Sequence, residues 1–419
     1  MQTNKFWTVV SKALAVMAVT LIMDLILAPG ASAASNYKVL YRFTGGADGA
    51  QPEDALVFDA SGNLYGTALG GGCCGSGTVF ELTPNSDGTW TQSVLYSFTG
   101  GSDGGSPASA VIFDASGNLY GTSVEGGDYG YGTVYKLTPN SDGGWTESVL
   151  YSFTGGSDGG DPTSGLTFDT NGNLFGTTWQ DGAYGHGVVF KLAANSDGSW
   201  TENTLHSFKG GKDGGTPDRG HLIFDAAGNL YGATAGWYGG ASNGTVFELT
   251  PNSDGTWTES VLHSFKGGKD GAAAEGTLVF DPAGSLYGTT YTGGAYGNGA
   301  VFKLTLGSDG KWKKNVLHPF KGGKVGANPF GGVVFDAAGN LYGPTYNGGG
   351  GPCSSCGTVF KLIPNPHGGW YERVPHQFEG SKNGLNPWGG VVLDATGNLY
   401  GTTVNGGING NGVVFEIMK

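Results

Sequence analysis

The sequence predicts an all-β protein, a seven-bladed β-propeller of four-stranded blades, and three observations lead to this prediction. A phrase related to GNLYG recurs along the chain, starting at Gly62, Gly117, Gly172, Gly228, Gly284, Gly339 and Gly397. A phrase related to GTVFKL follows each copy, so the chain is a tandem array of units of about 55 residues. Finally, the seventh unit lacks its last strand, and a matching strand stands at the other end of the chain.

Each unit contains the pattern of four short strands joined by turns. In the second unit, the apolar residues 111–113 end at an Asp-Ala-Ser-Gly turn, and residues 119–124 form the returning strand. A longer loop at 125–131 leads to a third strand at 132–137, and a tight turn at 139–143 leads to a fourth at 145–153. Four strands joined by hairpins are the content of one propeller blade.

Proline positions predict the order of the strands within a blade. Pro319 and Pro375 both fall in a fourth strand. Proline has no amide hydrogen to donate and is tolerated at the edge of a sheet. The fourth strand is therefore predicted to be outermost and the first strand innermost. Pro344 falls in a second strand, which we expect it to shorten.

The two ends of the array predict that it closes into a ring. The seventh unit stops at residue 419 after three strands, whereas residues 37–43 match the fourth strand of the other units. We predict that the N-terminal strand 37–43 pairs with the last blade, residues 390–418, and completes it. An open solenoid is the alternative, but it would not require a unit divided between the two termini.

The first 33 residues differ from the array. Lys5 and Lys12 precede an apolar run at 13–28, and Ala31-Ser32-Ala33 is the small-x-small pattern of a cleavage site. We expect a secretory signal peptide at 1–33, a single propeller at 34–419 without a membrane span, and a secreted, extracellular or periplasmic location. The formal net charge of −13 at pH 7 argues against a nucleic acid as partner.

The unit FTGGSDGG…P…FDASGNLYGT…GG…GTVYKLTP, present across residues 37–419, resembles the Gloeobacter–Verrucomicrobia (GloVer) tandem repeat of exported bacterial proteins. The resemblance implies an exported, propeller-like repeat protein. Relatives often carry a C-terminal sorting or anchoring segment, which residues 412–419 do not resemble, so secretion or loose surface association is expected. The resemblance transfers no catalytic residue, because the activity of the family is not defined.

One face of the propeller is predicted to carry the binding residues. The loops between blades and the loops between second and third strands emerge on this face, where the units differ most, and rigid scaffolds present ligand-binding residues on such loops. Large rings amid Gly, Asn and Asp suit stacking on sugars. The candidate ligand-binding residues are Tyr129, Tyr131, Trp179, Tyr184, His186, Trp237, Tyr238, Tyr291, Tyr296 and Trp388, and Phe330 shares the inter-blade position of Trp388. Packing of one loop against another is the alternative role.

Aspartates recur at fixed offsets. One series ends each first strand and another lies in the PNSDG turns, and both are predicted to cap turns. A third series, in the phrase GGxDG on the variable face, comprises Asp48, Asp103, Asp158, Asp213 and Asp270. Calcium requires about six to eight oxygen ligands, and no segment has the spacing of an EF-hand. No metal site or cofactor is therefore predicted, with calcium at the third series as the alternative.

All four cysteines lie in loops between second and third strands: Cys73 is adjacent to Cys74, and two residues separate Cys353 from Cys356. Export favours oxidised cysteines, and local pairing is geometrically the easiest. We expect a disulfide between Cys353 and Cys356, with the more strained Cys73–Cys74 pair as a further candidate. A four-thiolate zinc site is not expected, because the seventh blade separates the two pairs.

These patterns favour an exported binding module that takes a glycan or a protein on the aromatic loop face, and they lean away from an enzyme. Two alternatives stay open. One is a secreted polysaccharide lyase or glycoside hydrolase, with Asp181, His186, Glu125 and Asp128 as candidate groups. A glycosidase needs two carboxyl groups about 5–10 Å apart, which a sequence does not reveal. The other alternative is a structural or adhesive element of the cell surface.

Overall fold

The computed structural model describes residues 36–236, 242–350 and 353–419. The signal peptide expected at 1–33 and the candidate residues Trp237 and Tyr238 lie outside this part of the chain. Residues Tyr37–Lys419 form one unit, which is the propeller. In the described ranges, no helix is both long enough and apolar enough to cross a membrane.

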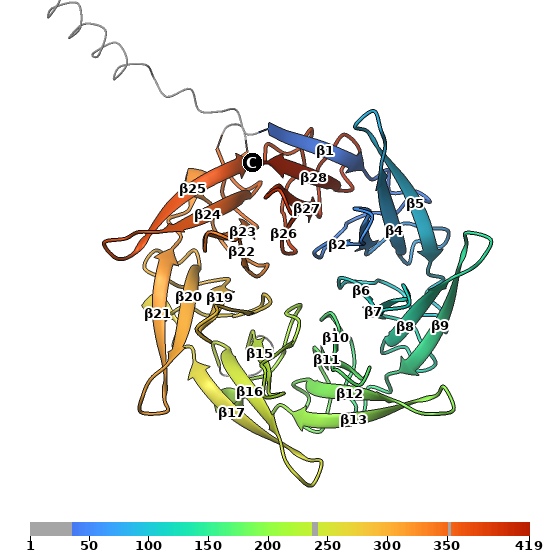
Figure 1. The fold of residues 1–419 in the computed structure, drawn as a ribbon, viewed down its shortest axis with the longest axis horizontal. Coiled ribbons are helices and arrows are strands. Elements are labelled where there is room, and N and C mark those ends of the chain that lie inside the picture. Colours follow the sequence, from blue (N-terminus) through green and yellow to red (C-terminus); the bar gives the residue numbers. More distant parts are fainter. Residues whose placement is uncertain (1–35, 237–241, 351–352) are drawn as a thin grey trace, which may run out of the picture. The chain divides into compact units, whose positions relative to one another are not determined.

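Within the described residues, 28 strands form seven antiparallel sheets of four strands, arranged around a central axis (Figure 1). Blade 1 contains β2 (Val57–Phe58), β3 (Leu64–Ala68), β4 (Thr78–Pro84) and β5 (Trp90–Ser97), from the axis outward. The prediction of a seven-bladed propeller with the first strand innermost and the fourth outermost is confirmed.

The other blades repeat this order. They comprise β6 (Ile112–Phe113), β7 (Leu119–Ser123), β8 (Thr133–Pro139) and β9 (Trp145–Ser152) in blade 2; β10 (Thr167–Phe168), β11 (Leu174–Thr178), β12 (Val188–Ala194) and β13 (Trp200–Ser207) in blade 3; β14 (Ile223–Phe224), β15 (Leu230–Thr234), β16 (Thr245–Pro251) and β17 (Trp257–Ser264) in blade 4; β18 (Val279–Phe280), β19 (Leu286–Thr290), β20 (Ala300–Leu306) and β21 (Trp312–Pro319) in blade 5; β22 (Val334–Phe335), β23 (Leu341–Thr345), β24 (Thr358–Pro364) and β25 (Trp370–Gln377) in blade 6; and β26 (Val392–Leu393), β27 (Leu399–Thr403) and β28 (Val413–Met418) in blade 7. Short 3₁₀ helices, η1 (Gly211–Asp213), η2 (Gly268–Asp270) and η3 (Gly323–Val325), precede blades 4, 5 and 6.

The ring closes through the N-terminal strand, as the sequence predicts. Strand β1 (Asn36–Arg42) is the outer strand of blade 7 and pairs with β28. The Tyr37 ring stacks on His376 of blade 6 with 3.7 Å between centroids, and Phe43 is fully buried against Phe80 of blade 1. The first strand of the chain therefore joins the last blade to both of its neighbours.

The hydrophobic core lies between the blades. A buried aromatic residue just after each outer strand meets the aromatic ring of the third strand in the next blade, edge to face, and such pairs add about 0.5–1.5 kcal/mol beyond area burial. The pairs are Phe43–Phe80, Phe98–Tyr135, Phe153–Phe190, Phe208–Phe247, Phe265–Phe302, Phe320–Phe360 and Phe378–Phe415, with centroids 5.0–5.3 Å apart. The repeated contact gives every inter-blade interface nearly the same geometry.

The aspartate that ends each innermost strand caps the following turn, as predicted. In blade 2, Asp114 accepts hydrogen bonds from the backbone amides of Ser116 and Asn118, at 2.8 and 2.9 Å, and from the Tyr120 hydroxyl at 3.1 Å. Partial burial alone would raise the pKa of Asp114, but hydrogen bonds from Asn118, Ser116 and Tyr120 outweigh it and lower that pKa. The carboxylate is therefore a structural group of the turn.

The expected shortening of a second strand by Pro344 is wrong. Strand β23 includes Pro344 and has five residues, like the other second strands. Its inner neighbour β22 pairs only with Leu341 and Tyr342, so no strand stands opposite residue 344 to receive an amide hydrogen. Blade 3 illustrates the geometry, since the equivalent amide of Thr177 donates to the Ser164 side chain at 2.9 Å.

Candidate functional site at the channel mouth

One position of the repeat varies from blade to blade and faces the mouth of the central channel. It lies in the inter-blade loop, two residues after a non-glycine residue whose backbone is in the left-handed region. In six of the blades it directly follows a proline. Its occupants in blades 1–7 are Glu53, Ala108, Thr163, Asp218, Glu275, Phe330 and Trp388. Acidic residues thus come from blades 1, 4 and 5, and large aromatic residues from blades 6 and 7.

A cavity of about 440 Å³ opens among these residues. Its lining residues are Trp179, Asp218, Glu275, Tyr291, Phe330, Tyr346 and Trp388. We call this cavity the funnel. Its volume falls within the range of about 300–1,000 Å³ that is usual for small-molecule sites.

Four of the aromatic side chains form a continuous wall. The Phe330 ring lies 4.8 Å from Trp388 and 5.4 Å from Tyr291, and Tyr346 lies 5.4 Å from Trp388, all as centroid distances in edge-to-face contacts. Blades 5, 6 and 7 supply this wall, and Trp179 comes from blade 3.

The backbone holds the aromatic residues of the funnel in place. Trp179, Tyr291 and Tyr346 each begin a loop between second and third strands, and the amide of each donates to a carbonyl of the inter-blade loop that precedes its own blade. Trp179 donates to Asp161 at 3.0 Å, Tyr291 to Ala273 at 2.8 Å and Tyr346 to Asn328 at 2.9 Å. The wall is therefore attached to the rigid part of each blade.

Arg219 crosses the channel below the funnel. Blade 4 has one residue more than the others between its proline and its innermost strand, and Arg219 there adopts φ of 54°. Its guanidinium lies 2.6 Å from the Glu53 carboxylate of blade 1, and it donates to the Ala108 carbonyl of blade 2 at 3.2 Å. A left-handed backbone at a residue of this size is strained and is often found at functional sites.

The same guanidinium stacks on Trp388, with its carbon 4.7 Å from the ring centroid, and its Nε lies 3.8 Å from Asp218. Arg219 therefore connects blades 1, 2, 4 and 7 through one side chain. Although burial alone would lower the pKa of Arg219, the carboxylates of Glu53 and Asp218 raise it.

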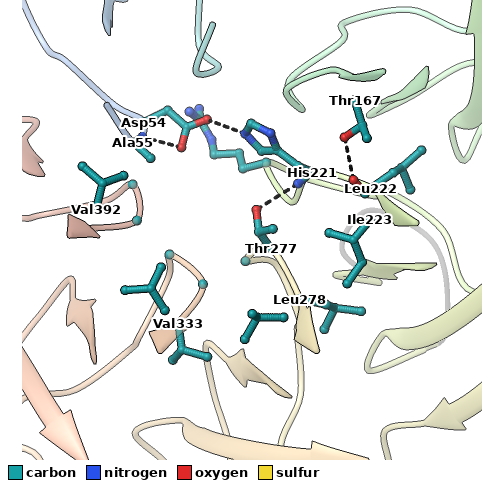
Figure 2. A pocket seen from close by; sticks show the side chains of 18 of the residues that line it. Asp54, Ala55, Thr167, His221, Leu222, Ile223, Thr277, Leu278, Val333 and Val392 are labelled. Atoms are coloured by element: carbon teal, nitrogen blue, oxygen red, sulfur yellow. Dashed lines mark hydrogen bonds and ion pairs between the residues drawn. The ribbon is translucent and has the colours of Figure 1, made fainter. Parts of the chain in front are cut away.

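A second polar pair, Asp54 and His221, connects blades 1 and 4 (Figure 2). His221 Nε2 of blade 4 lies 3.5 Å from Asp54 Oδ2 of blade 1, and the Ala110 amide donates to the same carboxylate at 2.8 Å. Burial alone would raise the pKa of Asp54, but these contacts lower it. The His221 amide in turn donates to the Thr277 hydroxyl at 3.0 Å.

Below these polar residues the channel is apolar. A cavity of about 640 Å³ is lined by side chains of the innermost strands, among them Ile112, Ile223, Val279, Val334 and Val392. Phe330 and Trp388 line both this cavity and the funnel, so they separate the two. Glu53, Asp54, Arg219 and His221 line the same cavity.

Burial sets the electrostatics of the funnel. It raises the pKa of Glu53 and of Asp218, in both cases against the opposing effect of Arg219. Burial is also the main cause of the raised pKa of Tyr291 and Tyr346, and the negative charges of Glu275 and Glu53, respectively, contribute to it.

The structure separates the described candidate ligand-binding residues into three groups. Trp179, Tyr291 and Trp388 come together in the funnel. Tyr129, Tyr184 and Tyr296 lie on the outer loops, where they are 60%, 55% and 53% exposed. Tyr131 and His186 lie beside the inter-blade glycines Gly155 and Gly210, in the position that suits packing of loop against loop.

The prediction missed Asp218, Glu275, Tyr346 and the Arg219–Glu53 pair. It gave priority to aromatic residues of the variable loops, whereas charged residues of the inter-blade loops also take part in the channel mouth. A usable signal was present in the residue two positions after the left-handed backbone, which is one of six different residue types in the seven blades amid an otherwise repeated phrase.

Two of the acids considered for an enzyme, Asp181 and Glu125, lie near a further acid, Asp161, on the loops of blades 2 and 3. Burial raises the pKa of Asp161 to about 6, and the charges of Asp181 and Glu125 contribute. Asp161 accepts a hydrogen bond from Gln180 at 2.6 Å, and Glu125 accepts one from Ser106 at 3.2 Å. Of the described residues, none of these acids lines the funnel or the lower cavity.

The third aspartate series also acts in turns. Asp103 accepts hydrogen bonds from the Thr99 amide at 2.8 Å and the Tyr96 hydroxyl at 3.0 Å. Between blades 3 and 4 the ligand atoms of His206, Asp213 and Glu259 lie within 4.8 Å of one another, and His206 contacts Asp213 at 3.2 Å. Calcium at this series stays an untested alternative.

The cysteine pairs differ in the structure. Cys353 and Cys356 are joined by a disulfide. The vicinal candidate is not closed, since Cys73 and Cys74 are exposed free thiols with their sulfur atoms 2.7 Å apart.

The fold and the funnel define a seven-bladed propeller with a ligand-sized cavity at one mouth of its channel. A candidate 6-phosphogluconolactonase from Bacteroides uniformis shares the fold with 17% identity and a TM-score of 0.52, over 81% of this chain and 88% of that one. So does the extracellular domain of a candidate one-component system from B. thetaiotaomicron, with 12% identity and a TM-score of 0.55, over 91% of this chain and 41% of that one. Identities this low show the fold alone.

The chain belongs to the Gloeobacter/Verrucomicrobia repeat family, whose pattern matches residues 29–241 and 220–419. The resemblance drawn from the repeat phrases is thereby confirmed. No curated protein has a sequence that matches the chain.

Proposed function

We propose that the protein is an exported binding module that takes a sugar unit of a glycan in the funnel. One observation carries the proposal: five aromatic side chains and two carboxylates surround a cavity of about 440 Å³ at the channel mouth. Flat aromatic faces pack on the apolar face of a pyranose, and carboxylates accept hydrogen bonds from its hydroxyl groups.

The rigidity of the site supports a binding role. Three of its aromatic residues, Trp179, Tyr291 and Tyr346, begin loops that backbone hydrogen bonds fix to the blades, and its wall residues contact one another edge to face. A site that is formed before the ligand arrives loses little conformational entropy on binding. Export is supported by the signal pattern at residues 1–33, the Cys353–Cys356 disulfide and the fold shared with an extracellular domain.

The test compares funnel residues with aromatic residues of the outer loops. Wild-type protein is screened on a glycan array, and the glycan that binds is titrated by calorimetry into Trp179→Ala, Tyr291→Ala and the control Tyr184→Ala. We expect the two funnel variants to bind at least tenfold more weakly and the control to bind within twofold of wild type. Equal affinity of all variants, or the absence of any bound glycan, would refute the proposal.

Glycan hydrolysis is the second candidate function, because the raised pKa of the Asp218 carboxyl is a property of general acids. The same glycan is incubated with wild type and with Asp218→Asn, and new reducing ends are measured. If reducing ends form with wild type and not with Asp218→Asn, the protein is a glycan hydrolase and not only a binding module.

A further inference from the structure

Each junction between neighbouring blades has three equivalent positions near the outer strands. They are a ring-bearing residue of one outer strand, the residue at the aspartate position of the GGxDG phrase, and a residue near the start of the next outer strand. We call each set a rim triplet. Around the ring the triplets are Tyr41, Asp48 and Gln92; Tyr96, Asp103 and Glu147; Tyr151, Asp158 and Glu202; His206, Asp213 and Glu259; His263, Asp270 and Lys314; His318, Val325 and Glu372; and His376, Asn383 and Tyr37. The triplet between blades 3 and 4 is the one that combines an imidazole with two carboxylates.

This triplet brings its side chains close together. His206 on β13, Asp213 in η1 and Glu259 on β17 have ligand atoms within 4.8 Å of one another, and the described residues contain no second group of this kind. His206 Nε2 lies 3.2 Å from Asp213 Oδ2, and the Lys209 amide donates to the same oxygen at 2.7 Å. Strands β13 and β17 are the outer strands of adjacent blades (Figure 1), so the group joins blade 3 to blade 4.

The protonation of the three side chains suits a metal ion. Burial lowers the pKa of His206, although Asp213 acts to raise it, so the imidazole is neutral at pH 7 and has a lone pair to donate. Burial, and next the charge of Asp213, raise the pKa of Glu259 to about 7, although Lys209 acts to lower it. Glu259 Oε1 is buried, and no described residue donates a hydrogen bond to it. A cation between the two carboxylates would relieve their repulsion.

The next junction has a cation of its own at the equivalent place. Between blades 4 and 5 the third position is Lys314, whose ammonium group lies 2.9 Å from Asp270 Oδ1 and whose side chain is only 4% exposed. Burial and, to a smaller extent, the charge of Lys314 lower the pKa of His263. Glu259 stands where this lysine would be, so the same pair of histidine and aspartate faces a carboxylate there. A bound cation would supply the positive charge that Lys314 supplies one blade further on.

The donor set favours a transition metal over calcium. Calcium takes about six to eight oxygen ligands, whereas one imidazole nitrogen with two carboxylates suits zinc and similar ions. Zinc holds nitrogen and oxygen ligands at about 2.0–2.2 Å, so its ligand atoms lie on the order of 3–4 Å apart. The His206–Asp213 contact meets this spacing, and Glu259 would approach further on binding. The three side chains are half-buried, so water can complete the coordination.

We infer that His206, Asp213 and Glu259 bind one divalent transition-metal ion of the zinc type, which links blades 3 and 4 at their outer strands. The ion would be structural, in the way that Lys314 links the next two blades. The inference is independent of the proposed function, because no member of this triplet is among the described residues that line the funnel or the lower cavity.

The test is a zinc titration of the purified, untagged protein, after treatment with EDTA and dialysis, at pH 7.5. The exposed thiols of Cys73 and Cys74 are alkylated first, because thiolates also bind zinc. Zinc chloride and calcium chloride are titrated by calorimetry into wild type, His206→Tyr, Glu259→Gln and the matched control His263→Tyr. Each substitution introduces a residue that another rim triplet already contains, and thermal unfolding without metal verifies that the variants fold.

We expect wild type to bind one zinc ion per chain, at least tenfold more tightly than calcium. His206→Tyr and Glu259→Gln are each expected to weaken zinc binding at least tenfold, and His263→Tyr to leave it within twofold. Zinc should also raise the unfolding temperature of wild type and of His263→Tyr, because an ion that binds only the folded state stabilises it. Glu259→Lys, which copies the Lys314 junction, should bind no zinc and provides a further variant should Glu259→Gln not fold.

Three results would overturn the inference. The first is the absence of one-site zinc binding to wild type. The second is zinc affinity that His206→Tyr and Glu259→Gln both retain, or that His263→Tyr loses equally, because the ion would then lie elsewhere. The third is calcium binding as tight as zinc binding, which would contradict the assignment to a transition metal. A loss of zinc binding confined to the variants of the His206 triplet would support it.

Discussion

The two faces of the ring use the same unusual backbone for different purposes. Gly117 in the tight turn and Gly132 before the third strand both have positive φ, of 82° and 89°, and both recur in every blade. A methyl group added at Gly117 would meet nothing within 4 Å. At Gly132 it would overlap the Ser123 carbonyl and reach Pro162 of the next blade at 2.7 Å.

The difference shows where the blades interlock. On the tight-turn face, glycine supplies a conformation that other residues adopt only with strain. On the loop face, glycine also allows one blade to approach the proline of the next, and the residue after that proline is the one that faces the channel. In this way Gly187, Gly299 and Gly357 contact Pro217, Pro329 and Pro387, which precede Asp218, Phe330 and Trp388. The close contact on the loop face therefore fixes the position of the funnel residues.

The largest expected difference between the two faces is in the stability lost when the partners of a carboxylate, or the carboxylate itself, are removed. Arg219→Met leaves Glu53 buried without its cation, and breaking a buried ion pair costs about 3–5 kcal/mol. Asp114→Ala on the tight-turn face removes hydrogen bonds to partly exposed groups and is expected to cost about 1–3 kcal/mol. Urea denaturation measures both.

The double variant Arg219→Met with Glu53→Gln is the control for this comparison. It removes both charges and is expected to recover more than half of the loss of the single variant. A double variant as unstable as Arg219→Met alone would show that the packing of Arg219 on Trp388, and not its charge, holds the channel mouth.

Substitution of the two glycines is expected to give a smaller difference in stability, again with the larger loss on the loop face. Gly132→Ala forces a methyl group against backbone and is expected to destabilise the fold by about 2–3 kcal/mol. Gly117→Ala is expected to destabilise the fold by about 1–2 kcal/mol, which is the cost of placing alanine in a left-handed backbone. Thermal unfolding of the two variants measures the difference, and equal losses would contradict the view that only the loop face is interlocked.

The smallest effect concerns Glu147 on the outer strand of blade 2. Burial, and next the charge of Asp103, raise the pKa of Glu147 from 4.5 to about 7. The folded state then binds more protons than the unfolded state between these values, so stability falls as pH rises from about 4.5 to about 7. Glu147→Gln removes this cost.

We expect Glu147→Gln to equal wild type near pH 4.5 and to be more stable at pH 8, by less than about 1 kcal/mol because the side chain is half exposed. Blade 1 has Gln92 at the equivalent position, where it donates to the Asp48 carbonyl at 3.2 Å. Urea midpoints at the two pH values measure the effect, with the exposed Glu379→Gln as control. A gain that is the same at both pH values would show that charge is not its cause.

Most of the fold could be predicted because the same local sequence pattern of strands and turns occurs seven times. The Asp-Ala-Ser-Gly turn ends the first strand by hydrogen bonds that lie within five residues, and Pro319 and Pro375 identify the outer strand. Pro344 was misjudged because the two-residue length of β22, which frees its position from pairing, is not visible in the sequence.

The site could be predicted only in part because its residues meet across the ring. Trp179, Tyr291 and Trp388 were found as aromatic residues in loops, but the sequence does not show that they share a cavity while Tyr129 and Tyr296 stay outside it. The contact of Arg219 with Glu53 joins blade 4 to blade 1 over a separation that no repeat pattern encodes. Closure of the ring brings these residues together.

Ring closure also has a consequence for folding during synthesis, because the two strands that close the ring are made at different times. Strand β1 leaves the ribosome before every blade, yet its partner β28 is the last strand to be made. Synthesis of the intervening chain takes on the order of tens of seconds, at about 5–20 residues per second. Throughout that time β1 is an unpaired edge, which other chains could capture. The strand that makes the finished ring stable is thus its most vulnerable segment while the ring is being built.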